Sequence, residues 1–552
     1  MRTDSILSPA RSAVGLQQRV RAVQALARSG DMKNAIRLAG EAVRSGAEDA
    51  TLLALAAYEQ IDGGAYERAL DYATRARDLS PRNADALNAA GLALTRLNRP
   101  GEALTVFDAA LRQAPGAAHI HFNKACAFEV LHDTKRARAG FERTIALQPA
   151  HAEALSRLAG MAAMRGDVAA TRDYAERSLR VNPQSVSAKL ALASADIEEK
   201  RFAEALQRLG PAMTSGAATA LQRTAAESIT GDALDGLGRC AEAFAAYARA
   251  NASTRALYHS VYEAPGIETA TARVARLTDY FTGAAVDVWQ RSDDAAVAPS
   301  RTHIFLVGFP RSGTTLLERV LDAHPDIEAM SELECLTEGA NAFMGSNADL
   351  DRLSTLDSAV LDKFRELYWR RVGEHGIAPS KSVFVDKMPL NAVQLCLIRK
   401  LFPRAKVIFA LRDPRDVTLS CFRRRFGMTP QTYQLLTLDG CATYYDAVMR
   451  LQAIYGQKLG MHIYYWRYEN MIADFEAETR RLCAFLGIKW DPAMIDFADR
   501  ARTTHITTPS ATQVTRGLYR DGEGQWRRYR AELEPVLPVL AHWVNSFGYP
   551  EN

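Results

Sequence analysis

Hydrophobic and small residues recur with a fixed period in the first half of the chain. Prolines stand 34 residues apart, at Pro81, Pro115, Pro149 and Pro183. A row of small residues keeps the same period, at Ala57, Gly91, Ala125, Ala159 and Ala193. Small residues let two helices approach closely, and a proline ends a helix. The pattern therefore predicts a repeated helix pair that ends at each proline.

A period of 34 residues resembles the tetratricopeptide repeat, an all-α solenoid of stacked helix pairs. The clearest unit is residues 84–117, with Leu87, Gly91, Leu94, Ala103, Phe107, Ala110 and Pro115 at the family's positions. Weaker copies on both sides extend the prediction to about seven helix pairs over residues 1–253. Such an array has a groove for a protein or peptide partner, but a spacer or dimerisation arm fits the pattern equally well.

Residues 254–300 lack the repeat register. A helical pattern over residues 267–281 is followed by a polar, alanine-rich stretch over residues 291–301. We predict a connecting helix and a short linker here. The remaining residues, 301–552, suit a single α/β domain in length.

In the second half, short apolar runs alternate with helical patterns. The runs are Ile304–Val307, Val383–Val385, Val407–Leu411 and Ile463–Tyr465. This alternation predicts a mainly parallel sheet with helices on both faces, and ligands at the carboxyl ends of its strands.

Polar clusters follow three of these runs, at residues 310–315, 386–389 and 412–416. The first, Pro-Arg-Ser-Gly-Thr-Thr, lies between a predicted strand and a predicted helix, where free backbone N–H groups bind anions. It resembles a Walker loop but lacks the lysine of that loop, which argues for a nucleotide other than a triphosphate. Two of the three clusters are strongly basic, as a ligand with several phosphate-like groups requires.

Two motifs together resemble the sulfotransferases that use 3′-phosphoadenosine-5′-phosphosulfate (PAPS). They are Phe-Pro-Arg-Ser-Gly-Thr-Thr at residues 309–315 and Val-Ile-Phe-Ala-Leu-Arg-Asp-Pro-Arg-Asp-Val-Thr-Leu-Ser at residues 407–420. The resemblance covers about residues 301–545. Within the family, Leu-Asp-Ala-His-Pro-Asp (321–326) and Trp-Arg-Tyr-Glu (466–469) are most similar to the branch that sulfates protein tyrosines. The resemblance implies a tetratricopeptide solenoid followed by an α/β, P-loop-like sulfotransferase domain.

The resemblance also implies roles for individual residues. Glu332 corresponds to the general base and Lys387 to the lysine that stabilises the transferred sulfuryl group, while Ser510 corresponds to a serine that helps the leaving phosphate. The expected 5′-phosphosulfate cradle is Arg311, Ser312, Gly313, Thr314 and Thr315, with Arg311 also catalytic. The expected contacts to the 3′-phosphate and the nucleotide are Arg412, Ser420, Arg424 and Tyr468.

The implied reaction moves the sulfuryl group of PAPS to a hydroxyl acceptor, with a protein tyrosine favoured and a carbohydrate or small phenol as alternatives. Two departures bear on it. Glu334 and Glu338 stand where the tyrosine-sulfating branch carries arginines, so we expect them to repel an acidic tyrosine motif. Gln525 precedes Trp526 where the family usually has a basic residue, which leaves the third contact to the 3′-phosphate open.

Composition narrows the possibilities further. The net charge of +4 over 552 residues is too small to indicate a nucleic-acid partner. The seven cysteines are scattered, and no apolar run approaches the ~20 residues of a membrane span. We therefore predict a cytoplasmic protein with neither a disulfide framework nor a metal site.

Two alternatives to an active sulfotransferase remain. A nucleotide or small-molecule kinase is disfavoured by the missing Walker lysine. A non-catalytic tetratricopeptide scaffold would be expected to lose charged site residues first, yet Arg311, Lys387, Arg412 and Ser420 are all present.

Overall fold

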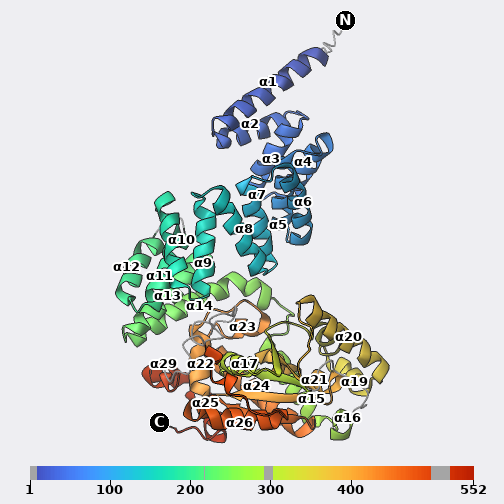
Figure 1. The fold of residues 1–552 in the computed structure, drawn as a ribbon, viewed down its shortest axis with the longest axis vertical. Coiled ribbons are helices and arrows are strands. Elements are labelled where there is room, and N and C mark those ends of the chain that lie inside the picture. Colours follow the sequence, from blue (N-terminus) through green and yellow to red (C-terminus); the bar gives the residue numbers. More distant parts are fainter. Residues whose placement is uncertain (1–8, 215, 217, 291–301, 499–521, 552) are drawn as a thin grey trace. The chain divides into compact units, whose positions relative to one another are not determined.

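The computed structural model describes residues 9–214, 216, 218–290, 302–498 and 522–551. Its contacts divide the chain into two compact units (Figure 1). The first comprises residues 1–163 and 167–192, and the second comprises residues 164–166 and 193–552. Each unit has its own buried apolar clusters.

The first unit is built of helices that pack consecutively along the chain. They are α1 (Pro9–Arg28), α2 (Met32–Arg44), α3 (Ala50–Asp62), α4 (Tyr66–Leu79), α5 (Ala84–Arg96), α6 (Pro100–Gln113), α7 (Ala118–Val130), α8 (Thr134–Leu147), α9 (Ala152–Met164) and α10 (Val168–Val181). Alternate helices also touch, as α3 does α5 and α5 does α7. The predicted all-α repeat is confirmed.

The periodic residues have the positions that the repeat requires. Each of the four spaced prolines lies two residues beyond the end of its helix, as Pro81 follows Leu79 at the end of α4. The small row is buried, and at Gly91 an added Cβ would lie 2.5 Å from Cε1 of Phe107. Because Phe107 belongs to the second helix of the same unit, only glycine permits this close approach.

Five further helices lead toward the sheet of the second unit. They are α12 (Phe202–Thr214), α13 (Ala220–Gly236), α14 (Cys240–Tyr262), α15 (Ala270–Gly283) and α16 (Val286–Gln290), with α11 (Val186–Glu198) before them. Helix α15 corresponds to the helical pattern predicted over residues 267–281. Its Val274, Leu277 and Phe281 are buried against the core of the sheet domain.

Five parallel strands form the sheet, in the order β2-β3-β1-β4-β5. They are β1 (Thr302–Gly308), β2 (Ile327–Ser331), β3 (Val383–Lys387), β4 (Lys406–Leu411) and β5 (His462–Arg467). Four were predicted from apolar runs. The edge strand β2 was not, because its sequence Ile-Glu-Ala-Met-Ser is short and only half buried. The predicted parallel α/β architecture is confirmed.

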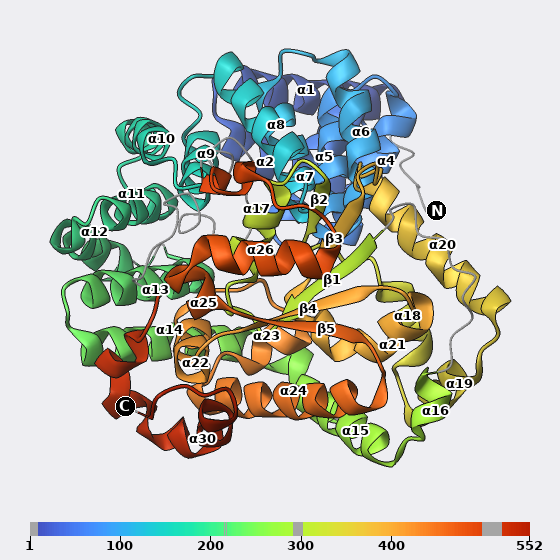
Figure 2. The same cartoon turned by 60° about the horizontal axis from the view of Figure 1, so that its bottom comes forward.

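Helices cover both faces of the sheet (Figure 2). On one face, Ile304, Leu306 and Ile408 pack against α17 (Thr314–Asp322) and α26 (Phe475–Leu486). On the other, Phe305, Phe384 and Phe409 share a core with α15, α21 (Leu395–Leu401) and α24 (Leu438–Lys458). The remaining helices of the domain are α18 (Thr337–Phe343), α19 (Asn347–Thr355), α20 (Ser358–Glu374), η1 (Pro389–Gln394), α22 (Pro414–Arg423), α23 (Pro430–Gln434), α25 (Tyr468–Ala473), η2 (Pro492–Met494), η3 (Gln525–Tyr529), α29 (Arg530–Leu533), η4 (Glu534–Val536) and α30 (Leu537–Ser546).

Helix α14 packs directly on the end of α22. Asn251 Nδ2 donates a hydrogen bond to the buried carbonyl of Phe422 at 2.8 Å, and the rings of Phe244 and Phe422 stack with centroids 4.8 Å apart. Tyr262 donates to the carbonyl of Met428 at 3.1 Å. Within the second unit, the last predicted repeat thus supports the segment after α22. The domain boundaries at residues 253 and 301 stay a prediction.

Candidate active site

The turn after β1 has an unusual backbone. Gly313 has φ of +91°, and a Cβ built on it would lie 2.8 Å from Cδ2 of Tyr468. Arg311, two residues earlier, is a non-glycine residue with φ of 71°. Residues with a side chain rarely adopt a backbone conformation with positive φ, and strained backbone of this kind concentrates at binding sites. Gly313 also caps α17 without a side-chain hydrogen bond, so no cap competes for the first N–H groups of that helix.

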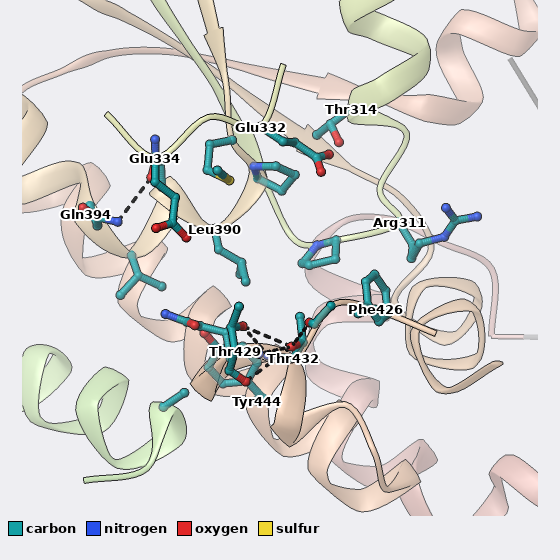
Figure 3. Close-up of a pocket in the computed structure, with 18 of the residues that line it drawn as sticks. Arg311, Thr314, Glu332, Glu334, Leu390, Gln394, Phe426, Thr429, Thr432 and Tyr444 are labelled. Carbon is teal, nitrogen blue, oxygen red and sulfur yellow. Dashed lines mark hydrogen bonds between the residues drawn. The ribbon is translucent and has the colours of Figure 1, made fainter. Parts of the chain in front are cut away.

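Arg311 joins this turn to α22. Its Nε donates a hydrogen bond to Ser420 Oγ at 3.0 Å. The two residues are 109 positions apart in the chain, yet strands β1 and β4 are neighbours and end at the same edge. In Figure 3 the Arg311 side chain extends away from Glu332.

Arg412, directly after β4, contacts the same turn. Its Nη1 donates to the Arg311 carbonyl at 3.1 Å, its Nη2 donates to the carbonyl of Gly522, and its guanidinium lies 5.1 Å from the centroid of the Tyr468 ring. Its Nε is buried and has no hydrogen-bond partner among the described residues. An unpaired donor of this kind is costly unless a ligand satisfies it.

Lys387 ends β3 and is completely buried. Its Nζ lies 2.6 Å from Glu332 Oε1 and 3.0 Å from Glu318 Oε2. The register of the sheet explains the first contact, because Lys387 pairs with Ser331 at the end of β2 and Glu332 follows at once. The Glu332 N–H also donates to the Lys387 carbonyl at 2.8 Å, and Glu332 takes φ of 49° there.

A cavity of about 990 Å³ opens at this edge of the sheet (Figure 3). One half is lined by residues of the predicted nucleotide site: Arg311, Gly313, Thr314, Thr315, Arg412 and Tyr468. Glu332 lines it too, and in Figure 3 its carboxylate points toward Thr314. The residues predicted from three separate strand ends therefore meet at one cavity.

The other half of the cavity has mixed walls. Apolar residues come from η1, α18, α24 and the segment after α22, and charged residues from α15, the segment after α22 and the loop between β2 and α18. They include Leu390, Ala340, Met344, Tyr444, Phe426, Arg273, Arg425 and Glu334. Ala270, Arg273 and Val274 show that α15, predicted only as a connecting helix, forms part of this wall.

Some predicted residues lie elsewhere. Lys387 and Ser420 sit behind the lining, in contact with Glu332 and Arg311 respectively. Arg424 has its Nη1 3.9 Å from Asp232 Oδ2 of α13 and does not line the cavity, whereas its neighbour Arg425 does. Ser510 lies outside the described residues.

Glu318 was missed by sequence reasoning. It lies on the buried side of α17, where its carboxylate contacts Lys387 and accepts a hydrogen bond from Ser331 Oγ at 3.0 Å. A glutamate flanked by Leu317 and Val320 on an apolar helix face was the available signal, because a buried carboxylate requires a partner.

Other charged residues of the third polar cluster, residues 412–416, make contacts within the protein. Asp416 accepts backbone hydrogen bonds from Gly524 and Trp526 at 2.7 and 2.9 Å. Arg415 pairs with Asp413 at 2.7 Å and lies over the ring of Trp526. Gln525, where a basic residue was expected, accepts a hydrogen bond from Arg423 Nη1 at 3.0 Å.

Asp386 lies beside Lys387 in β3 but is enclosed by the aromatic core. Burial raises the pKa of its carboxyl to about 7, and Tyr368 donates to its Oδ2 at 2.9 Å. His303 contacts the Tyr368 hydroxyl at 3.1 Å, and burial lowers the pKa of this histidine to about 3. None of these three residues lines the cavity, and all three are buried in the core.

No described helix is both long and apolar enough to cross a membrane. Within the same residues, no group of three His, Cys, Asp or Glu side chains is arranged to hold a metal ion.

Fold and site together define a class of protein: a parallel α/β domain with a glycine-containing turn between β1 and α17, preceded by helical repeats. Residues 303–492 match the model of the sulfotransferase family, and residues 51–118 and 122–179 match that of the tetratricopeptide repeat. The chain thus carries tetratricopeptide repeats followed by a domain of the sulfotransferase family.

Curated relatives are similar at modest identity. Protein-tyrosine sulfotransferase A of Caenorhabditis elegans is 28% identical over 284 residues, which cover 48% of this chain and 70% of that protein. An uncharacterized protein of Aquifex aeolicus is 28% identical over 266 residues, 46% of this chain but only 34% of its own length. The sulfotransferase domain of the Synechococcus PCC 7002 olefin synthase, a solved structure, aligns over 48% of this chain and 100% of its own with 20% identity and a TM-score of 0.35.

Proposed function

We propose that this protein is a PAPS-dependent sulfotransferase that sulfates a hydroxyl acceptor, with a protein tyrosine favoured. The observation that carries the proposal is the pairing of buried Lys387 at 2.6 Å with Glu332, which lines the same cavity as residues of the turn 310–315. A carboxylate and an ammonium beside an anion-binding turn are what transfer of a sulfuryl group to a hydroxyl requires.

The residues present fit PAPS. The uncapped start of α17 offers N–H groups to the phosphosulfate, and Gly313 leaves the space that a Cβ would fill beside Tyr468. The Nε of Arg412, which has no hydrogen-bond partner in the part of the chain that the structure describes, offers a charged donor. Arg311, Ser312, Thr314 and Thr315 would hold the 5′ end, and Arg412 and Ser420 the 3′-phosphate. Arg424 is directed to Asp232, so its part in this site depends on a change of rotamer.

When bound, PAPS supplies the sulfuryl group, whose bond to the 5′-phosphate oxygen breaks as the bond to the acceptor oxygen forms. Glu332 takes the proton from the acceptor hydroxyl. A tyrosine hydroxyl has a pKa near 10, so it needs such a base at neutral pH. Lys387 and Arg311 stabilise the negative charge on the transferred group and the leaving phosphate.

The half of the cavity away from the predicted nucleotide site would take the acceptor, and its charged residues bear on which acceptor is expected. Glu338, expected to repel acidic peptides, does not line the cavity: a hydrogen bond from Arg371 lowers the pKa of its carboxyl and compensates its charge. Glu334 lines the cavity and retains the repulsion, while Arg273 and Arg425 add positive charge to the same half. Relatives named as protein-tyrosine sulfotransferases favour tyrosine over a carbohydrate or small phenol.

The test uses purified full-length protein with ³⁵S-labelled PAPS and three acceptor sets: tyrosine peptides with neutral or acidic flanks, simple phenols, and oligosaccharides. We expect label on a tyrosine peptide. Thermal shifts with adenosine 3′,5′-bisphosphate and with ATP–Mg²⁺ run in parallel. Stabilisation by ATP–Mg²⁺ alone would indicate a kinase, and the absence of both nucleotide binding and transfer would indicate a scaffold.

The tetratricopeptide repeats would recruit the acceptor or a partner protein. Pull-down of the sulfated polypeptide by the full-length protein, but not by a variant altered on the repeats alone, is the outcome expected.

A further inference from the structure

Two carboxylates compete for one buried ammonium at the end of β3. Lys387 Nζ is 2.6 Å from Glu332 Oε1 and 3.0 Å from Glu318 Oε2, and its side chain has no exposed surface. A catalytic lysine needs one counter-ion to remain charged inside a protein. One carboxylate would be enough to balance the charge of Lys387, so the presence of two calls for another explanation.

The two carboxylates differ in what else they touch. The Glu318 side chain is 1% exposed, and it is fixed by Ser331 Oγ at 3.0 Å and by Arg319 Nη2 at 3.3 Å. The Glu332 side chain is 34% exposed and lines the cavity. Glu332 lines the cavity and can reach a substrate, whereas Glu318 is held by Ser331 of β2, Lys387 of β3 and Arg319 of its own helix.

This difference matters because Glu332 has two incompatible tasks in the proposed reaction. Before transfer it neutralises Lys387, and during transfer it must accept a proton and become neutral. A buried ammonium that loses its only counter-ion is strongly destabilised and tends to lose its own proton. Lys387 would then lose its charge at the moment when charge accumulates on the sulfuryl oxygens.

We infer that Glu318 is a positioning residue: it holds the Lys387 ammonium charged and in place at the strand end while Glu332 leaves that ammonium to act as the base. This inference rests on the proposed sulfotransferase function and deepens it. Glu318 is buried on α17 and does not line the cavity, so we expect it to touch neither nucleotide nor acceptor.

Among the described residues, the titratable groups beside Lys387, Glu332 and Glu318 come from three elements. From α17 come Glu318 and Arg319, and from the end of β2 comes Glu332. From β3 comes Asp386, which precedes Lys387 in the strand and accepts a hydrogen bond from the Tyr368 hydroxyl of α20. Removal of the Glu318 charge should therefore affect Glu332 and Lys387 most directly.

The decisive experiment is the pH profile of kcat/KM for Glu318→Gln in the full-length protein, with PAPS and the best acceptor found. Loss of a negative charge makes neighbouring groups release protons more readily. The acid limb, set by ionisation of the base, and the alkaline limb, set by loss of the ammonium proton, should both move to lower pH, by about one unit. At neutral pH we expect kcat to fall about tenfold or more, with binding of adenosine 3′,5′-bisphosphate retained.

Glu478→Gln is the matched control. Glu478 is equally buried and hydrogen-bonded by Tyr464 and Arg481, but it lies on α26. It should leave both limbs in place. A second variant, Glu318→Asp, keeps the charge but is too short to hold the 3.0 Å contact, so kcat should fall without movement of either limb.

The inference is overturned if Glu318→Gln lowers activity with unshifted limbs, or if Glu318→Asp retains wild-type kcat. Should Glu318→Gln fail to fold, the Glu318→Asp measurement decides alone. Failure of the proposed function looks different, because the wild-type protein would then transfer no label to any acceptor.

Discussion

Arg311 Nε and Ser420 Oγ are joined by a hydrogen bond of 3.0 Å that links the turn after β1 to helix α22. The two motifs that these residues represent were recognised separately in the sequence, about a hundred positions apart. Their contact places the expected sites for the 5′ and 3′ ends of the nucleotide within one polar network. Ser420 Oγ accepts this hydrogen bond and can still donate its own O–H to a phosphate.

Ser420→Ala should weaken binding of adenosine 3′,5′-bisphosphate. The change removes a hydroxyl that can bond a charged phosphate and also orients Arg311. Hydrogen bonds to charged groups are worth about 1.5–3 kcal/mol, so Kd should rise about tenfold or more. Isothermal titration calorimetry measures the change, and Ser546→Ala on the exposed end of α30 serves as the control. An unchanged Kd for Ser420→Ala would remove this serine from the nucleotide site.

Glu332→Gln should abolish most of the transfer activity while nucleotide binding persists. Loss of a general base typically costs about 10²–10⁴-fold in kcat. The chain offers a close comparison in Glu334, two residues further on, which lines the same cavity but does not contact Lys387. Glu334→Gln should keep kcat within a few-fold and instead lower KM for acceptors with acidic flanks. Radiolabel transfer under saturating PAPS distinguishes the two, and equal loss of kcat in both variants would contradict the assignment.

Much of this site could be predicted because its residues follow strands that apolar runs reveal. Arg311, Lys387 and Arg412 each follow such a run within four residues, and parallel strands bring their ends together whatever the details of packing. The repeat could be predicted equally well, because its period and its proline positions can be read directly from the sequence.

What the sequence did not reveal depends on burial and on side-chain direction. Strand β2 was missed because only two of its five residues are buried. Glu318 was missed because helix periodicity marks a face as buried without saying which partner a polar residue on that face will meet. Arg424 and Arg425 were indistinguishable in sequence, yet the end of α22 turns the first toward Asp232 and the second toward the cavity.

Gly313→Ala should prevent nucleotide binding. A Cβ there would lie 2.8 Å from Tyr468 and 3.1 Å from Trp466, and φ is +91°. The control is Gly376→Ala, where φ is +77° but no atom lies within 4 Å of the new Cβ. Both variants incur a backbone cost of about 1–2 kcal/mol, because alanine disfavours positive φ. Since only the first also places a Cβ against Tyr468 and Trp466, only the first should lose affinity for adenosine 3′,5′-bisphosphate. If both bind alike, contact at Tyr468 is not what selects glycine in this turn.

The buried carboxyl of Asp386 should make the sheet domain less stable as pH rises from about 4 to about 7. Its pKa is raised from 3.8 to about 7 by burial, so in this range the folded state keeps a proton that the unfolded state has released. The free energy of unfolding falls with rising pH wherever the folded state binds more protons than the unfolded state. A pKa difference of about three units corresponds to roughly 4 kcal/mol. Below pH 4 and above pH 7 this contribution no longer changes with pH.

Asp386→Asn tests that sign. Asparagine keeps the shape and an acceptor for the Tyr368 hydroxyl but cannot ionise, so the variant should gain stability relative to wild type as pH rises and gain most above pH 7. Hydrogen exchange of amides in β1 and β3, measured at pH 5 and pH 8, isolates the sheet from the repeats. Asp279→Asn, on the exposed side of α15, should show no such difference. The same pH dependence in Asp386→Asn and wild type would mean that Asp386 is ionised in the folded protein, with Lys387 beside it supplying the compensating charge.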